Sequence, residues 1–288
     1  MDLSYGLLAL TALICLFTKA RKLMFLSMVI TVFTALFQEI ISLSGMFSAS
    51  CFLAICYAYF NYQNLNKFIK ATLYGLIWVL LIGFAFHILP GFSNVLIVDK
   101  LSLSELSCPF SMYLNFDKSI AALILYITSG LAISEKVISK KAILQTILAL
   151  ILCIGVILVP GLISGYIALD IKVPDILLIW IVNNLLFVCM SEEVIFRGFL
   201  QESLKSFFVK KVSIDYLHII VASVVFALAH FKGGAPFMIL TLIAGVFYGY
   251  VYEKTGRIFC AMLVHFGLNL THLIFFTYPA SVCMTRMA

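Results

Sequence analysis

The run ILLIWIVNNLLFVCM, residues 176–190, leads directly into SEEVIFRGFL, residues 191–200. The first part predicts the body of a membrane helix, because about 20 apolar residues span a hydrocarbon core of roughly 30 Å. The second part adds Glu192, Glu193 and Arg197 in the same apolar surroundings. A charge in hydrocarbon costs about 2.5 to 17 kcal/mol, depending on how the cost is measured. These three side chains therefore indicate partners, or a chemical task, inside the membrane.

The composition of the whole chain predicts the same kind of fold. Of the 288 residues, 64% are hydrophobic and 11% are charged, and a soluble domain could not cover that much apolar surface with so few charges. The apolar runs are continuous, whereas the strands of a membrane barrel alternate in segments of about 10 residues. We therefore predict an all-α, polytopic transmembrane helix bundle of about eight to ten spans. The candidate spans are residues 3–17, 23–40, 41–60, 72–90, 119–133, 143–167, 176–203, 217–231, 237–252 and 258–276.

The basic residues gather in alternate loops. Thirteen lysines and arginines fall in one set of loops, and five, Lys118 and Lys172 among them, fall in the other. The positive-inside rule places the thirteen in the cytoplasm, which predicts that both termini lie outside. The formal net charge of +6 thus reflects membrane topology, and we expect no nucleic-acid partner.

The longest loop, about 91–118, suggests a division of the chain near its middle. We predict an N-terminal transmembrane bundle of unknown role over residues 1–142 and a C-terminal bundle over residues 143–288. The eight cysteines contain no CxxC pair, so most of them are expected to be small buried hydrophobes.

The first polar motif is Glu192-Glu193-x-x-x-Arg197. Adjacent residues of a helix point about 100° apart, so the two carboxylates cannot have the same surroundings. Glu193 and Arg197 are i,i+4 neighbours in the favourable order for an ion pair, which leaves Glu192 as the candidate general base. In the alternative interpretation, both glutamates end the span at the water interface.

Two further motifs carry histidines. Phe226-x-x-x-His230 lies in one later span, and His265-x-x-x-Asn269 lies in the next but one, with His272 on the same stripe of that helix. Imidazole and carboxamide groups can hold a water molecule or a developing oxyanion. The alternative is purely structural, because polar residues in membrane bundles often form hydrogen bonds between helices. That alternative is favoured for His272.

Taken together, the three motifs resemble those of the CPBP family, the CAAX prenyl proteases of type II and their bacteriocin-processing or immunity-related (Abi) homologues. Its EExxxR, FxxxH and HxxxN motifs stand in order, and the resemblance covers about 143–276. The resemblance implies an intramembrane endopeptidase in which Glu192 activates a water molecule. By the same resemblance, His230 orients that water and His265 and Asn269 complete the site. Glu193, Arg197 and Phe226 would support these residues.

The resemblance also bears on cofactors and partners. A metal such as zinc could be held by Glu192, His230 and His265, but we favour a metal-free glutamate protease and assign no cofactor with certainty. The expected partners are the lipid bilayer and a membrane protein or lipidated peptide substrate; the oligomeric state stays open. We expect an integral multi-pass protein of a bacterial cytoplasmic membrane.

Two other functions compete with proteolysis. A catalytically silent scaffold or immunity factor would keep the same fold, although the intact set of polar residues argues against degeneration. A proton-coupled transporter would use buried Glu, His and Arg as a relay, but it predicts inverted repeats that this sequence lacks. No HExxH, GxSG or GxGD motif is present, so the other intramembrane protease chemistries lack their usual marks.

Overall fold

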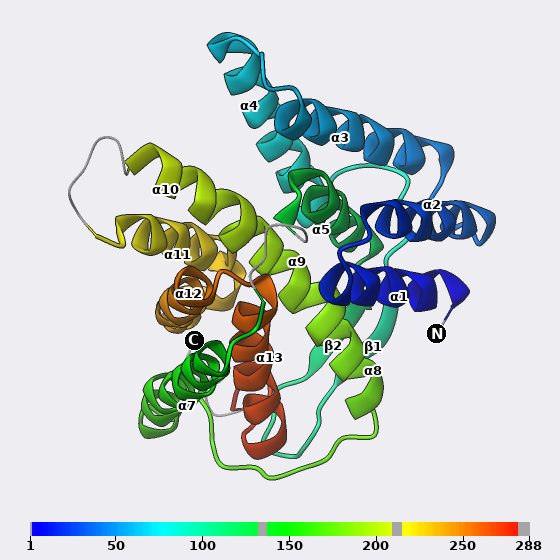
Figure 1. Cartoon of the computed structure of the whole chain (residues 1–288). Coiled ribbons are helices and arrows are strands. Elements are labelled where there is room, and N and C mark those ends of the chain that lie inside the picture. Colours follow the sequence, from blue (N-terminus) through cyan, green and yellow to red (C-terminus); the bar gives the residue numbers. More distant parts are fainter. Residues whose placement is uncertain (1, 132–136, 209–214, 282–288) are drawn as a thin grey trace. The chain divides into compact units, whose positions relative to one another are not determined.

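The computed structural model describes residues 2–131, 137–208 and 215–281 (Figure 1). One of the eight cysteines and four of the basic residues counted above lie outside these ranges, namely Cys283, Lys136, Lys210, Lys211 and Arg286. The predicted all-α class is confirmed, because helices dominate the described chain and each predicted span overlaps helical residues. The helices are α1 (Leu3–Phe17), α2 (Arg21–Phe37), α3 (Leu43–Asn61), α4 (Lys67–Ala85), α5 (Phe116–Ser129), α7 (Lys140–Ile163), α8 (Leu177–Val182), α9 (Met190–Glu193), α10 (Glu202–Phe208), α11 (Leu217–Ala229), α12 (Gly234–Thr255) and α13 (Ile258–Phe275).

Many of these helices are suited to lipid. Within the described ranges, six helical stretches are long and apolar enough to cross a membrane, and two shorter apolar helices, α1 and α11, accompany them. Large apolar side chains such as Phe68 and Ile163 are 81% exposed, which is the pattern of a surface that faces lipid chains. The chain is therefore a multi-pass membrane protein. The six stretches are Leu43–Asn61, Lys67–Ala85, Lys140–Ile163, Leu177–Phe208, Phe231–Thr255 and Ile258–Phe275.

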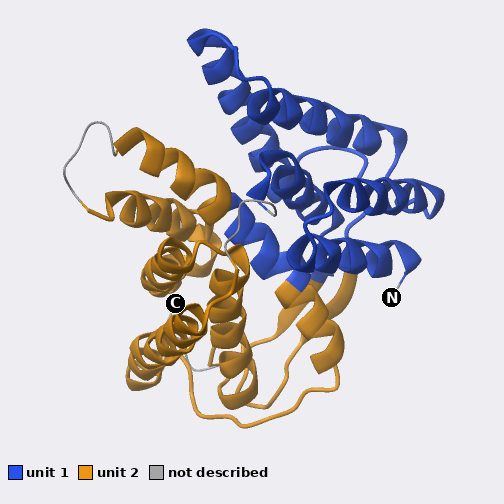
Figure 2. Cartoon of the chain, viewed as in Figure 1, with its two compact units in different colours: residues 1–95, 113–135, 186–195 blue, residues 96–112, 136–185, 196–288 orange. Residues whose placement is uncertain are grey.

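The chain forms two compact units (Figure 2). Unit 1 comprises Met1–Val95, Tyr113–Glu135 and Leu186–Ile195. Unit 2 comprises Leu96–Met112, Lys136–Leu185 and Phe196–Ala288. The two compact units thus divide the chain differently from the functional boundary expected at residue 142, which stays a prediction.

The centre of unit 1 is helix α5. Nearly all of its residues are buried, and it packs against α1, α3, α4 and the short helix α9. The segment before α5 is fixed by Tyr5 of α1, whose hydroxyl donates a hydrogen bond to the carbonyl of Leu114 over 2.9 Å. The ring of Tyr5 also meets Phe116 edge to face, with centroids 5.8 Å apart. The start of α5 is therefore held by both polar and aromatic contacts.

Unit 2 is built from α7, α10, α11, α12 and α13. Helix α12 packs against α7, α11 and α13, and α7 also packs against α13. Small residues allow the close approach: a Cβ at Gly249 of α12 would lie 2.7 Å from Gln201 Oε1 and 2.8 Å from Ile219 Cγ2. Glycine serves this purpose in membrane bundles, where backbones approach to gain packing contacts.

The loop predicted at about 91–118 contains a two-stranded sheet. Strands β1 (Val95–Leu101) and β2 (Phe110–Leu114) pair with each other. Side chains from this sheet, Val98 and Met112, are buried in a cluster with Trp180 and Leu273. Hydrophobic burial therefore orders a segment that the sequence indicated only as a linker or cap.

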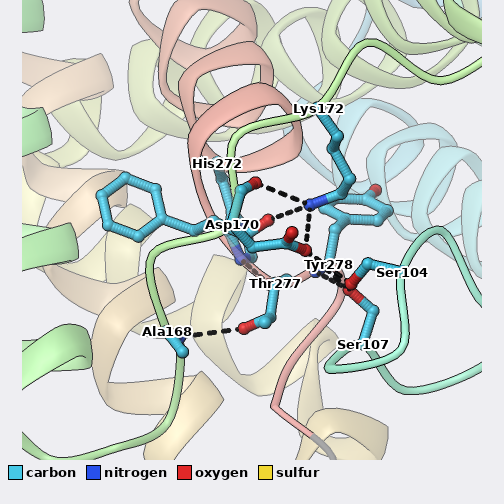
Figure 3. A network of polar contacts seen from close by, with 9 residues as sticks. Ser104, Ser107, Ala168, Asp170, Lys172, His272, Thr277 and Tyr278 are labelled. Carbon is cyan, nitrogen blue, oxygen red and sulfur yellow. Dashed lines mark hydrogen bonds and ion pairs between the residues drawn. The ribbon is translucent and has the colours of Figure 1, made fainter.

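A polar network connects the same loop to two other segments of unit 2 (Figure 3). The ammonium of Lys172 lies 2.8 Å from Asp170 Oδ2 and also donates to the carbonyl of Phe276. Ser104 donates to the same Asp170 oxygen over 2.6 Å, and Ser107 accepts a hydrogen bond from the backbone N–H of Tyr278. The network thereby joins three segments that are distant in sequence.

The carboxyl group of Asp170 is ionised more easily than usual. Partial desolvation opposes this effect, but hydrogen bonds from Lys172, Ser104 and Ser107, together with the charge of Lys172, lower the pKa of Asp170 below its ordinary value. Asp170 is thus the negative centre of the network.

Candidate active site

The helix that carries the first motif is not regularly α-helical. Residues Asn183–Cys189 and Val194–Gln201 form π-helical turns, and the four residues of α9, MSEE, lie between them. π-Helical turns are rare and frequently occur at functional sites. The sequence predicted the span but gave no sign of these turns. Both glutamates thus occupy a short α-helical step inside an irregular helix.

Glu192 is buried and has a charged partner. Its Oε1 lies 2.6 Å from the Nζ of Lys118, and the two side chains are 10% and 17% exposed. Lys118 lies in the first turn of α5, not in the loop to which the topology argument assigned it. The sequence predicts no charged partner for Glu192 on its own helix, and Lys118 supplies one from another helix of unit 1.

Glu193 is completely buried. Burial of both carboxylates in protein argues against the alternative in which they simply end a span at the water interface. The expected ion pair of Glu193 with Arg197 stays a prediction, because Glu193 belongs to unit 1 and Arg197 to unit 2.

Arg197 is buried among aromatic rings of unit 2. Its guanidinium carbon lies 4.5 Å from the ring centroid of Phe226 and 5.5 Å from that of Tyr248. Its Nη2 also donates to the carbonyl of Gly245 over 3.2 Å. Cation–π contacts of a desolvated guanidinium contribute about 2 kcal/mol. Arg197 therefore stabilises the packing of π-helical residues 196–201 against α11 and α12.

His230 stands at the end of α11, one turn after Phe226. Its Nδ1 lies 2.8 Å from the carbonyl oxygen of Phe226, and the two rings are in contact with centroids 4.6 Å apart. Because a carbonyl oxygen can only accept, Nδ1 must carry the hydrogen, and Nε2 is then the acceptor of a neutral ring. The backbone thus fixes the tautomer of His230.

His265 is held by two aromatic rings. It is buried in α13 and stacks on Tyr248 of α12, and it meets Phe226 edge to face at 6.0 Å. Phe226 therefore contacts Arg197, His230 and His265, so the structure brings these four predicted residues together. Tyr248 was missed by the sequence argument, because an aromatic residue in an apolar span carries no sign of a role.

Asn269 has a polar partner that the sequence argument also missed. Its Nδ2 donates to Oδ1 of Asn184 over 3.2 Å, and Asn184 lies buried in the π-helical turn of residues 183–189. Two adjacent asparagines, Asn183 and Asn184, are visible within the apolar run 176–190, but nothing in the sequence links them to α13. His272 has the structural role that was favoured for it, with its Nε2 3.1 Å from the carbonyl of Thr277.

The sequence analysis named three candidate ligands for a metal ion, Glu192, His230 and His265. In the part of the chain that the structure describes, no group of three or more His, Cys, Asp or Glu side chains is placed to hold one. The contact of Glu192 Oε1 is made with an ammonium group instead. Glu192 belongs to unit 1 whereas His230 and His265 belong to unit 2, so the zinc alternative with these three ligands stays a hypothesis.

Comparison with known proteins finds one family model that matches the C-terminal half of the chain. Residues 174–271 match the family described as type II CAAX prenyl endopeptidase Rce1-like, and all three motifs fall inside the match. This confirms the resemblance inferred from the motifs and supports, at the level of the family, a CAAX-type intramembrane protease. Lys118 lies outside the matched residues. No curated protein and no solved structure matches the chain.

Proposed function

We propose that this protein is an intramembrane endopeptidase that hydrolyses a peptide bond in a membrane-associated or lipidated substrate, with a water molecule activated by Glu192. The observation that carries the proposal is the family match over residues 174–271, which contains the three motifs intact. The buried position of Glu192 supports its role, because buried acidic residues in membrane helices are retained for function.

In the proposed reaction, Glu192 takes a proton from water as the water oxygen attacks the carbonyl carbon of the substrate. The carbonyl π bond opens, and its oxygen becomes the negatively charged oxygen of a tetrahedral intermediate. When this intermediate collapses, the C–N bond breaks and the proton held by Glu192 passes to the leaving amine. All atoms of the water molecule are thus found in the two products.

The remaining polar residues would orient the water, stabilise the oxyanion or support the helix that carries Glu192. His230 has an accepting Nε2 when neutral, which suits it to orient the attacking water through a hydrogen bond. His265 and Asn269 offer donors for the developing oxyanion, a type of stabilisation that is often worth about 3 to 4 kcal/mol per donor. Glu193 and Arg197 would support the helix that presents Glu192.

The proposal is tested with purified full-length protein in detergent and a panel of membrane and prenylated peptides, with cleavage followed by mass spectrometry. We expect the wild type to cleave at least one peptide, and Glu192→Ala to abolish cleavage while the fold is retained. Glu105→Ala is the matched control, because Glu105 lies exposed in the loop between β1 and β2.

Each remaining outcome has a defined meaning. A wild type that cleaves nothing in a broad panel favours the alternative, a catalytically silent membrane scaffold. Cleavage that survives Glu192→Ala contradicts the proposed base. Loss of wild-type activity in excess EDTA, with recovery on addition of zinc, would contradict the metal-free mechanism.

A further inference from the structure

Lys118 is a side chain of the N-terminal half that contacts the proposed base. It stands 74 positions before Glu192, outside the residues that match the protease family. Its ammonium lies 2.6 Å from Glu192 Oε1, and both groups belong to unit 1. We propose that Lys118 is a positioning residue that holds the carboxylate of Glu192, so that α5 helps to orient the proposed base. This inference rests on the proposed function of Glu192.

The backbone around Lys118 is itself firmly held. The backbone N–H of Lys118 donates to Asp117 Oδ1 over 2.7 Å, and the other oxygen of this buried carboxylate lies 2.8 Å from His87 Nδ1. One residue earlier, the N–H of Phe116 donates to Asn94 Oδ1 over 2.8 Å. These side chains satisfy donors in the first turn of α5, which has no partners within the helix for them. The starting point of the lysine side chain is therefore fixed.

The two segments that carry the pair also contact each other through aromatic side chains. Tyr5 meets Phe116 on one side and Phe187 on the other, with centroids 5.8 and 6.2 Å apart. Phe187 precedes Glu192 by five positions on the same helix. Ser119 Oγ lies 3.5 Å from the carbonyl oxygen of Phe187. The register between α5 and residues 186–195 is thus set by several contacts besides the ion pair.

The chemistry of the pair explains why both charges can be buried. An unpartnered carboxylate or ammonium in apolar surroundings carries a large desolvation cost, and each group here supplies the charge that the other requires. The contact also restricts the carboxylate to one orientation. A general base must lie within hydrogen-bond reach of its water, and a misplacement of about 1 Å can cost about 100-fold in rate.

The kinetic test compares Lys118→Met, which keeps most of the side-chain length without the charge, with Lys118→Arg, which keeps the charge. We expect Lys118→Met to lower kcat by about 100-fold with KM changed less than 3-fold. Lys118→Arg should lower kcat by only about 10-fold, because a cation again faces Glu192. The matched control is Lys205→Met, since Lys205 forms an ion pair of similar length with Glu253, at 2.7 Å, and has no part in the proposed site.

A stability cycle tests the pair independently of activity. We would measure Tm for the wild type, Lys118→Met, Glu192→Gln and the double variant. Each single change leaves one buried charge without its partner, so the double variant should lose less than the sum of the single losses. Lys205→Met should be additive with Glu192→Gln.

The outcomes separate the two proposals. Additive Tm losses for Lys118→Met and Glu192→Gln overturn the pairing, whether or not a peptide is cleaved. Coupled losses together with an unchanged kcat in Lys118→Met overturn the positioning role, although the ion pair then stands. An inactive wild type overturns the proposed function and with it the positioning role, while the stability cycle still decides whether Lys118 holds Glu192.

Discussion

The imidazole of His265 stacks on the phenol ring of Tyr248, with centroids 4.5 Å apart and planes inclined by 15°. Stacking of this kind fixes the plane of the imidazole while leaving its nitrogens at the ring edge, where they can meet a substrate. A residue that sequence reasoning passed over therefore sets the orientation of one that it singled out.

This relationship predicts the effect of changing Tyr248. Tyr248→Leu should lower kcat about 10-fold, because the imidazole of His265 loses the surface that orients it. Tyr248→Phe keeps the ring and should retain most of the activity. Steady-state kinetics on a cleaved peptide checks both, and equal losses in the two variants would show that the hydroxyl matters and the stack does not.

Replacement of Arg197 by lysine should not be conservative. A lysine keeps the charge but lacks the planar guanidinium that lies over Phe226 and Tyr248, so we expect a loss of about 2 kcal/mol in stability. Thermal unfolding in detergent measures it. Arg21→Lys, at a partly exposed arginine that contacts Asn61, is the control and should change Tm much less. Equal shifts in the two variants would contradict the role given to the aromatic contacts.

The two nitrogens of His230 should be separable by mutation. Asparagine can place an amide near the position of Nδ1 and so keep the hydrogen bond to Phe226, but it has nothing at the position of Nε2. His230→Asn should therefore fold with a Tm close to that of the wild type and lose about 100-fold in kcat. A variant that keeps its activity would exclude His230 from orienting the water.

The network around Asp170 predicts a dependence of stability on pH. The pKa of Asp170 is lowered in the folded protein below its ordinary value of 3.8, so the folded state prefers the ionised carboxylate. Its stabilising contribution is fully present above the unfolded pKa and is lost as the pH falls through the folded pKa.

The matching experiment compares Tm from pH 7 to pH 3 for the wild type and Asp170→Asn. The wild type should be the more stable protein at pH 7, and the difference should shrink as the pH falls below about 4. Asp99→Asn, at an exposed position of β1, should follow the wild type throughout. A difference between the wild type and Asp170→Asn that stays constant across this range would refute the linkage.

The helices could be predicted because membrane spans are visible in a sequence as continuous apolar runs separated by charged residues. For the same reason, Glu192, Arg197, His230 and His265 were visible as polar exceptions within such runs. The π-helical turns at 183–189 and 194–201 were not visible, because a helix that is apolar on all sides shows no period from which its pitch could be measured.

Contacts between distant segments were beyond reach for a different reason. Lys118 stood at the edge of a loop in the sequence, and nothing there linked it to a carboxylate on a later helix. The pairing of β1 with β2 was missed as well, since short strands inside a long connection give a weak signal. In both cases the deciding information lies in tertiary packing, which a single sequence does not contain.

The ion pair between Lys118 and Glu192 has a consequence for biosynthesis. A ribosome delivers α5 to the membrane before residues 177–208 emerge, so the cation arrives first. Before Glu192 is inserted, a lysine near a helix end can keep its ammonium in water by extending its long side chain toward the headgroups. Residues 177–208 then bring Glu192 into a bilayer that already contains Lys118. The carboxylate therefore finds its counter-ion in place as soon as it is inserted.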